Sequence, residues 1–344
     1  MKNRPKLKCV IVGTDTLRGK EILDVLGKKE FPLASLEFFD PDVEEEYSKL
    51  TQFRNEPKVI HRLDKDSFLG ADLVFLAADK KTNLEYGLRA SGLNIRTIDL
   101  SETFNAREEV PLIVAGVNDG ALGSDGHPLI ANPHPVTIFL SHIFDPIIRV
   151  FGLAKAVAFV LQPASAFEKS GIEELASQSV ALLGSSTPSK KIFKEQVAFN
   201  FLSHTEKPDK NGFSPGELQV LAEIKRVLGK KDLPLTLSIV QAPVFHTYSI
   251  MTYFELAVET SIQGLQKLFK GNRFFKICPP TDSRPVSPVS TSGKDEIFIG
   301  QIKREEIFPR SFWVWSVADN LTLGSALNAY EIARALFDFA PSRP

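Results

Sequence analysis

Cysteine and net charge are both scarce in this chain of 344 residues, and each scarcity excludes a class of protein. The two cysteines, Cys9 and Cys278, cannot build the disulfide framework of a small secreted domain, and neither has a second ligand at zinc-site spacing. Lys and Arg together number 41 against 42 for Asp and Glu, so no basic field attracts nucleic acid or an anionic membrane. We therefore expect no metal, no nucleic-acid partner and no membrane partner.

Long hydrophobic runs are missing as well. The apolar segment that follows the basic start, KCVIVG at 8–13, is far shorter than the roughly 20 residues that span a bilayer. A cytoplasmic protein is the expectation. Apolar residues make up 43% and charged residues 24%, which is ordinary for globular proteins, and the length exceeds what one hydrophobic core usually organises. Two domains are therefore expected.

The first part of the chain alternates apolar runs with amphipathic segments. Helices are predicted at 15–29, where Gly27 with Lys28 and Lys29 marks the stop, and at 83–92. The apolar runs predict buried strands at 7–14, 33–40, 71–79, 94–101 and 110–118. Strands that alternate with helices predict an α/β fold with a parallel sheet and right-handed crossovers.

The pattern changes after about residue 132. A helix is predicted at 134–152 and another at 319–340, and 184–191 and 278–294 are expected to be loops. Longer alternating strands are predicted at 153–165, 233–256 and 295–305, which favours a mixed or antiparallel sheet. We expect residues 1–132 with 319–344 to form one domain and residues 133–318 to form a second.

A possible nucleotide-binding turn joins the first predicted strand to the first helix. Gly13 ends the strand and Gly19 opens the helix, but a dinucleotide turn also needs a glycine between them. That position is Thr16, and Asp15 adds negative charge beside it. The alternative is a turn that merely links a strand to a helix. The candidate cofactor-binding residues are Gly13, Thr14, Thr16, Leu17, Gly19 and Asp40.

Acidic residues follow the second predicted strand. Asp40 stands about where an acid usually bonds a ribose hydroxyl, and Asp42 and residues 44–46 extend the acidic run. These acids would repel the extra phosphate of NADP, so NAD is the favoured cofactor if one binds. A solvated acidic loop is the alternative.

Six segments carry a family pattern: VPLIVAGVN at 110–118, IANPHPVTI at 130–138, VLQPASAFEKSGIEEL at 160–175, EQVAFNFLSH at 195–204, VQAPVFHTYS at 240–249 and DNLTLGSALNAYEIA at 319–333. In sequence and in order they resemble segments of the aspartate-semialdehyde dehydrogenase family. The glycine turn is similar to the family's G-A-T-G-x-V-G. The resemblance implies a Rossmann-like domain, an α+β dimerisation and substrate domain with a mixed sheet, and a homodimer formed through that sheet.

The resemblance also implies a reaction. The family reduces aspartyl phosphate with NADPH through a cysteine thiolate, with a histidine to shuttle the proton and a glutamine to orient the intermediate. An arginine and a glutamate of the family hold the carboxylate and the amine of the substrate. Three family site positions are retained, as Asn132, Gln162 and Glu217. Five are altered: the cysteine is Pro135, the histidine Tyr248, the substrate arginine Gln241, a phosphate-binding arginine Asn105, and a lysine Gln219.

The altered positions remove groups that the family chemistry needs. Proline has no nucleophile, and loss of the nucleophile of a covalent mechanism typically costs about a million-fold in rate. A tyrosine has a reference pKa of about 10 against about 6.5 for histidine, so it is a poor base near neutral pH. We therefore expect a member without the family reaction.

The sequence leaves three interpretations open. The first is a degenerate family member that acts as a binding or structural homodimer, with a small-molecule ligand in its pocket as one role. The second is an active NAD(P)-dependent semialdehyde dehydrogenase of amino-acid biosynthesis with a displaced or altered active site. The third is a nucleotide-sensing module that binds NAD or NADP without turnover.

Four other side chains are weighed as chemical groups. Cys9 lies in a predicted buried strand, which favours inert packing, and Cys278 begins the Pro- and Ser-rich segment far from the matched motifs. His134 adjoins Pro135, and His246 would share a strand face with Tyr248. The two histidines are either part of a polar pocket with Gln162 and Glu217 or ordinary partly buried residues.

Overall fold

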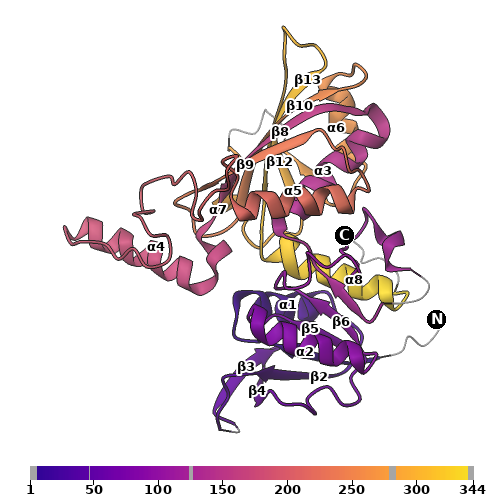
Figure 1. Cartoon of the computed structure of the whole chain (residues 1–344), viewed down its shortest axis with the longest axis vertical. Coiled ribbons are helices and arrows are strands. Elements are labelled where there is room, and N and C mark those ends of the chain that lie inside the picture. Colours follow the sequence, from indigo (N-terminus) through magenta and orange to yellow (C-terminus); the bar gives the residue numbers. More distant parts are fainter. Residues whose placement is uncertain (1–5, 46, 124–126, 279–283, 340–344) are drawn as a thin grey trace. The chain divides into compact units, whose positions relative to one another are not determined.

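The computed structural model describes residues 6–45, 47–123, 127–278 and 284–339, and the chain forms two compact units (Figure 1). One unit comprises residues 1–134 with 325–344, and the other comprises residues 135–324. The sequence predicted that the chain passes from one domain to the other after residues 132 and 318.

The first unit is built on a seven-stranded sheet in the order β3-β4-β2-β1-β5-β6-β7. Its strands are β1 (Leu7–Val12), β2 (Leu33–Asp40), β3 (Lys49–Phe53), β4 (Glu56–Arg62), β5 (Leu73–Leu76), β6 (Arg96–Asp99) and β7 (Leu129–Ala131). Neighbouring strands are parallel except for the β3–β4 hairpin at the edge. All four residues of β5 are buried, so the parallel sheet predicted from continuous apolar runs is confirmed.

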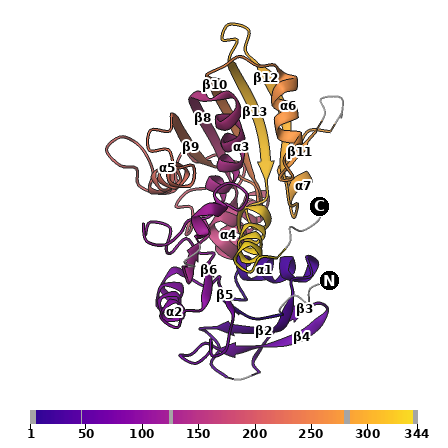
Figure 2. The same ribbon diagram turned by 90° about the vertical axis from the view of Figure 1, so that its right-hand side faces the viewer.

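In the described part of this unit the α-helices are α1 (Leu17–Lys28), α2 (Lys80–Gly92) and α8 (Asn328–Leu336), and a 3-10 turn spans Asp119–Leu122. Figure 2 shows α1 and α2 on opposite sides of the strands, as right-handed crossovers leading away from the sheet centre in two directions require. Thr16 and Asp79 cap the starts of α1 and α2 through their side chains. Helix α1 ends at Lys28 with its C-cap at Lys29, so the stop predicted at Gly27 with Lys28 and Lys29 is confirmed.

The segment 110–118 does not form the predicted strand. Leu112 makes one isolated bridge to Ala131, and β7 closes the sheet instead. The amide of Asn118 accepts from the N–H of Val114 at 2.8 Å and donates to the carbonyl of Leu112 at 2.9 Å. These local bonds compete with the sheet ladder, so the chain turns where its apolar residues alone predict a strand.

The second unit contains a mixed six-stranded sheet in the order β11-β12-β13-β10-β8-β9. Its strands are β8 (Leu153–Gln162), β9 (Leu235–Gln241), β10 (Tyr248–Leu256), β11 (Phe275–Ile277), β12 (Ile297–Arg304) and β13 (Ser311–Ala318). The β8–β9 and β11–β12 pairs are parallel and the other pairs are antiparallel. The predicted mixed sheet is therefore confirmed.

The helices of this unit are α3 (Pro135–Phe151), α4 (Glu168–Leu183), α5 (Pro215–Val227), α6 (Ile262–Lys270) and the single turn α7 (Pro288–Thr291). Helix α3 packs on one sheet face, where the rings of Phe144 and Phe254 meet edge to face at 6.1 Å. Figure 2 shows α3 and α6 running alongside the strands. Helix α7 falls within the predicted loop 278–294, of which residues 279–283 lie outside the described residues.

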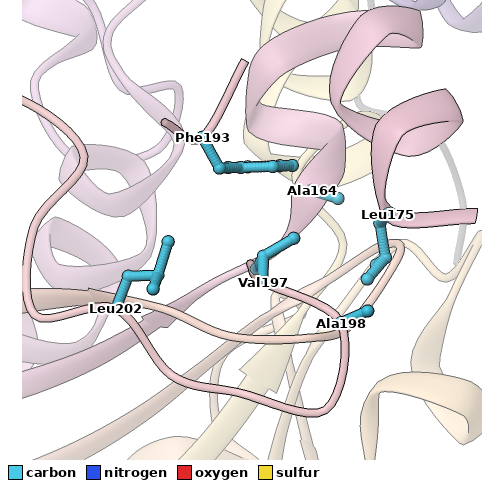
Figure 3. Close-up of a cluster of buried hydrophobic side chains, with 6 residues drawn as sticks. All are labelled: Ala164, Leu175, Phe193, Val197, Ala198 and Leu202. Carbon is cyan, nitrogen blue, oxygen red and sulfur yellow. The ribbon is translucent and has the colours of Figure 1, made fainter. Parts of the chain in front are cut away.

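Helix α4 projects away from the sheet of its own unit and has a small core of its own (Figures 1 and 3). The core consists of Ala164, Leu175, Phe193, Val197, Ala198 and Leu202. Glu174 and Gln178 on α4 are buried and accept bonds from the backbone N–H groups of residues 191–193 and 197–198. These polar contacts hold the following segment against α4.

Within the described ranges, no helix combines the length and the apolar composition that crossing a bilayer requires.

Candidate functional site

Three of the family site positions meet at one end of the second sheet. Gln162 ends β8 and is paired in register with Gln241, which ends the parallel strand β9. Tyr248 begins β10, which runs antiparallel to β8, so its first residues lie beside the end of β8. The sheet thus brings together residues that are distant in sequence, as expected for a shared site.

These three side chains hydrogen-bond to one another. The hydroxyl of Tyr248 donates to Oε1 of Gln162 at 3.1 Å, and Nε2 of Gln162 donates to Oε1 of Gln241 at 3.1 Å. Nε2 of Gln241 donates to the backbone carbonyls of Gln162 at 3.0 Å and Ala242 at 3.1 Å. Tyr248 and Gln241 are each 1% exposed. We call these residues the amide cluster; it consists of two amides and a phenol, none formally charged.

The family cysteine position is the first residue of α3. Pro135 suits that place because the first residue of a helix needs no backbone N–H donor. Its ring packs closely on Gly324, where an added Cβ would lie 2.8 Å from Cβ of Pro135 and 2.8 Å from the ring of Phe139. The ring of Phe139 in turn meets that of Tyr248 at 6.3 Å. The position is therefore apolar and well packed, with no atom that could attack a carbonyl.

Glu217 is retained, but its carboxylate binds backbone. One oxygen accepts from the N–H of Ser214 at 2.7 Å in a capping box at the start of α5. The other accepts from the N–H of Ile239 in β9 at 2.8 Å. The side chain is 6% exposed. It joins α5 to the sheet, which is a structural use of a residue that the resemblance assigned to substrate.

The family lysine position is Gln219, and it also bonds within the unit. Its Nε2 donates to one oxygen of Glu223 at 2.8 Å, and the hydroxyl of Thr137 on α3 donates to the other at 2.7 Å. Glu223 is 4% exposed. Sequence reasoning missed Thr137 and Glu223, because neither stands at a family site position; their pairing depends on the packing of α3 on α5.

Asn132 and Asn105 lie in the first unit and are both buried. Asn132 accepts from Nδ2 of Asn328 at 2.7 Å, and the same nitrogen donates to the carbonyl of Ile113 at 2.9 Å. Oδ1 of Asn328 accepts from the N–H of Ala115 at 2.9 Å. Asn132 is therefore part of a network that fixes the segment 113–115.

The two histidines do not share the predicted arrangement. His246 precedes β10, which begins at Tyr248, and Thr247 between them has a φ of 70°. The prediction that His246 and Tyr248 share a strand face is therefore wrong. His134 and His246 are both half-buried. Among the residues that the structure describes, no three His, Cys, Asp or Glu side chains gather as metal ligands would.

The two cysteines lie in different units and differ in burial. Cys9 in β1 is 1% exposed, and burial together with Asp72 raises the pKa of its thiol to about 12, so the thiol is protonated near neutral pH. Cys278 is half-buried and follows β11. The strand order puts β11 at the opposite edge of the sheet from β9.

The glycine turn of the first unit fits its fold closely. Gly13 has a φ of +84°, and a Cβ added to it would lie 2.3 Å from the backbone nitrogen of Ala78. A Cβ added to Gly19 would lie 2.1 Å from the carbonyl oxygen of Gly13. Both glycines are therefore required by chain packing, whether or not a nucleotide binds.

The remaining residues of the turn do not fit a dinucleotide held as the glycine pattern requires. Thr16 fills the close-approach position and bonds within the turn, accepting from the N–H of Gly19 at 2.9 Å. Thr14 is 1% exposed and Leu17 is half-buried. Arg18, which sequence reasoning did not single out, donates to the carbonyl of Leu100 at 3.0 Å. The sequence signal that could have identified Arg18 is that the family motif has a valine at this position.

The predicted ribose-binding acid is buried. Asp40 ends β2 and is 3% exposed. Burial, with a smaller contribution from the negative charge of Asp42, raises the pKa of the Asp40 carboxyl from 3.8 to about 6. As folded, Asp40 does not offer its carboxylate to a ligand in solvent.

Comparison with known proteins identifies the family to which this fold belongs. The NAD-binding domain model of semialdehyde dehydrogenases matches residues 8–124, and the model of their dimerisation domain matches residues 144–323. The chain belongs to the semialdehyde dehydrogenase family. The family predicted from the motif segments is therefore confirmed.

The relatives match almost end to end. The aspartate-semialdehyde dehydrogenase of Aquifex aeolicus is 28% identical over 96% of this chain and 97% of its own length. That of Prochlorococcus marinus is 25% identical over 97% and 96%. Aspartate semialdehyde dehydrogenase II of Vibrio cholerae, solved with ASA, has a TM-score of 0.90 at 23% identity over 97% of this chain and 99% of its own. The Candida albicans enzyme, solved with NADP, has a TM-score of 0.72 at 14% identity, over 98% and 100%.

The buried carboxyl of Asp40 predicts a pH dependence of stability. Because its folded-state pKa is raised, the folded state binds the proton more tightly than the unfolded state, and stability falls as pH rises from 3.8 to about 6. Asp40→Asn removes this loss, so the variant should have the higher urea midpoint above pH 6 and little advantage at pH 4. Asp24→Asn, which removes an exposed partner of Lys28, should change neither midpoint appreciably. Identical pH profiles for Asp40→Asn and the unaltered chain would contradict the raised pKa.

Proposed function

We propose that this chain is a homodimeric member of the semialdehyde dehydrogenase family that does not carry out the phosphorylating dehydrogenation of an aldehyde. It acts instead as a binding or structural protein. The observation that carries this proposal is the amide cluster: the family positions for the orienting glutamine, the substrate arginine and the proton-shuttling histidine form a neutral group that bonds to itself. Pro135 supplies no nucleophile.

The chemistry of the family substrate supports the proposal. An acyl phosphate with a free carboxylate carries several negative charges, which proteins normally bind with bidentate arginine and with lysine. Gln241 and Gln219 stand at two of those positions, and each amide already donates within the unit. An anion would therefore have to break existing bonds and would gain no opposite charge from these residues.

Tyr248 is a poor substitute for the family histidine. Its hydroxyl donates to Gln162 and lies in a side chain that is 1% exposed. From reference pKa values, a phenol in place of an imidazole gives up roughly 5 kcal/mol in proton transfer near neutral pH. Residue 135 supplies no thiolate, so no covalent intermediate forms there and the reaction has no step that needs this proton shuttle.

A homodimer is supported by the outer face of the second sheet, opposite Phe254 and α3. Paired residues in a sheet project to the same face, and the register aligns Val157 with Tyr253 and Phe159 with Met251, each of which aligns with a tryptophan of β13. This outer face comprises Val157, Phe159, Met251, Tyr253, Trp313 and Trp315. Val157 is 40% and Phe159 45% exposed. A second copy of the same face, related by a two-fold axis, would cover these side chains.

The alternative function is an active NAD(P)-dependent semialdehyde dehydrogenase of amino-acid biosynthesis with an altered site. The observation that favours it is the match over nearly the whole length of curated dehydrogenases. It needs a nucleophile other than residue 135, and Cys278 is the more exposed of the two thiols.

The direct test of the proposal is a rate assay. Purified protein is incubated with aspartate semialdehyde, inorganic phosphate and NAD or NADP, and reduced cofactor is followed by absorbance. We expect no rate above the enzyme-free blank, because a chain without its nucleophile falls about a million-fold below an active relative. The Aquifex aeolicus relative, assayed in parallel, is the positive control. A phosphate-dependent rate that disappears in Cys278→Ser would reverse the proposal in favour of the alternative.

The dimer is tested at the outer face. Phe159→Glu puts a charge at an apolar contact, so we expect dimer affinity to fall at least about 30-fold, equivalent to about 2 kcal/mol. Size-exclusion chromatography with light scattering gives the mass at several concentrations. Leu218→Glu on α5 is the matched control, since Leu218 is 43% exposed and lies outside the outer face. A monomeric unaltered chain, or a Phe159→Glu dimer as tight as the unaltered one, would exclude this interface.

A further inference from the structure

The carboxyl end of the first sheet contains the crevice where doubly wound folds bind ligands. From β1 the chain goes to β2 on one side, and after β4 it crosses back to β5 on the other side of β1, so the strand order reverses between β1 and β5. Ligands of such sheets bind at this switch point, outside the carboxyl ends of the strands. What fills this switch-point crevice therefore decides whether a dinucleotide can enter.

Thr16 lies across the switch-point crevice. Its hydroxyl is 2.9 Å from the carbonyl oxygen of Gly13, which follows β1, and 3.0 Å from that of Ala77, which follows β5. It also accepts from the N–H of Gly19 in the first turn of α1. The side chain thus bridges the two strands that flank the switch point and uses a helix N–H that a phosphate would otherwise meet.

Arg18 extends the cover to the next strand. It starts from α1, which follows β1, and its Nη1 donates to the carbonyl of Leu100 just after β6 at 3.0 Å. Since β5 lies between β1 and β6, the side chain passes over the carboxyl end of β5. Arg18 is half-buried. The family motif has a valine at this position, which could not reach β6.

We infer that Thr16 and Arg18 close the switch-point crevice, so that this unit has the fold of an NAD-binding domain without binding NAD or NADP in the crevice. A dinucleotide would have to displace both side chains from backbone carbonyls that offer it no donor in return. This inference concerns the first unit alone and does not depend on the amide cluster of the second. A chain inactive for lack of a nucleophile could still bind NAD, and a chain closed to NAD could still have an intact second unit.

The test is to open the crevice. Isothermal titration of the full chain with NAD and with NADP is compared among the unaltered protein, Thr16→Gly, Arg18→Val and the double variant, which restores the family residues at both positions. We expect no saturable binding to the unaltered chain at about 1 mM cofactor, and a gain of at least about tenfold in affinity for the double variant. Glycine is an acceptable N-cap, so α1 should persist in Thr16→Gly.

Two matched controls show whether a gain in affinity comes from opening the crevice or from a change in charge or in the helix cap. Thr16→Ser keeps the bridging hydroxyl, and Lys20→Val removes an exposed cation from the same helical turn, which pairs with Asp15 at 3.2 Å. Neither should increase affinity. Circular dichroism checks that each variant is folded. If the variants with Thr16→Gly do not fold, Arg18→Val, which leaves the helix cap intact, provides the test: a gain in cofactor affinity supports the inference and no gain contradicts it.

Three results would overturn the inference. Micromolar binding of either cofactor by the unaltered chain would show an open crevice. A folded double variant that binds no more tightly than the unaltered chain would show that these residues do not close it. A loss of affinity in Arg18→Val would show that Arg18 holds the cofactor phosphate.

Discussion

A hydrogen bond from the hydroxyl of Tyr248 to the side-chain oxygen of Gln162 joins two strand ends in the second unit, and Gln241 extends it to a third. Buried polar groups are stable when they are paired, and in the amide cluster they pair with one another. An arginine and a histidine at the same positions would place charge there that needs an anionic partner. Two amides and a phenol need none, so the site is complete without a ligand.

The same constraint explains the residues around the amide cluster. Glu217 satisfies backbone N–H groups of α5 and β9, and Gln219 satisfies the buried Glu223. In the first unit Thr16 and Arg18 satisfy carbonyls at the ends of three strands. In this structure these side chains join elements of the fold. The scaffold glycines persist because chain packing requires them, which is a different reason from cofactor binding.

Much of the fold follows from sequence pattern. Continuous apolar runs predicted the parallel strands, and alternation in 153–165 and 233–256 predicted the mixed sheet, because these patterns reflect burial on two faces or one. The motif positions predicted that Gln162, Gln241 and Tyr248 meet. The strand predicted at 110–118 is wrong, because the side-chain amide of Asn118 forms hydrogen bonds that the hydrophobic pattern does not reveal.

The bonds of the site could not be predicted. Glu217 looked like a retained substrate ligand, and only the approach of β9 to α5 shows that its second oxygen binds Ile239. The role of Arg18 likewise depends on β6, whose end lies beside the turn only after the sheet forms. Strand β10 begins only at Tyr248, so His246 does not share a strand face with it. Such a boundary depends on local backbone conformation, in this case the positive φ of Thr247.

The most direct test of the account is a crystal structure of the chain grown with aspartate semialdehyde and phosphate at saturating concentration. We expect Tyr248, Gln162 and Gln241 to keep the bonds of 3.1 Å that join them, with neither compound in contact with the amide cluster. A substrate carboxylate or phosphate bonded to Gln162 or Gln241, with the Tyr248 bond broken, would contradict it.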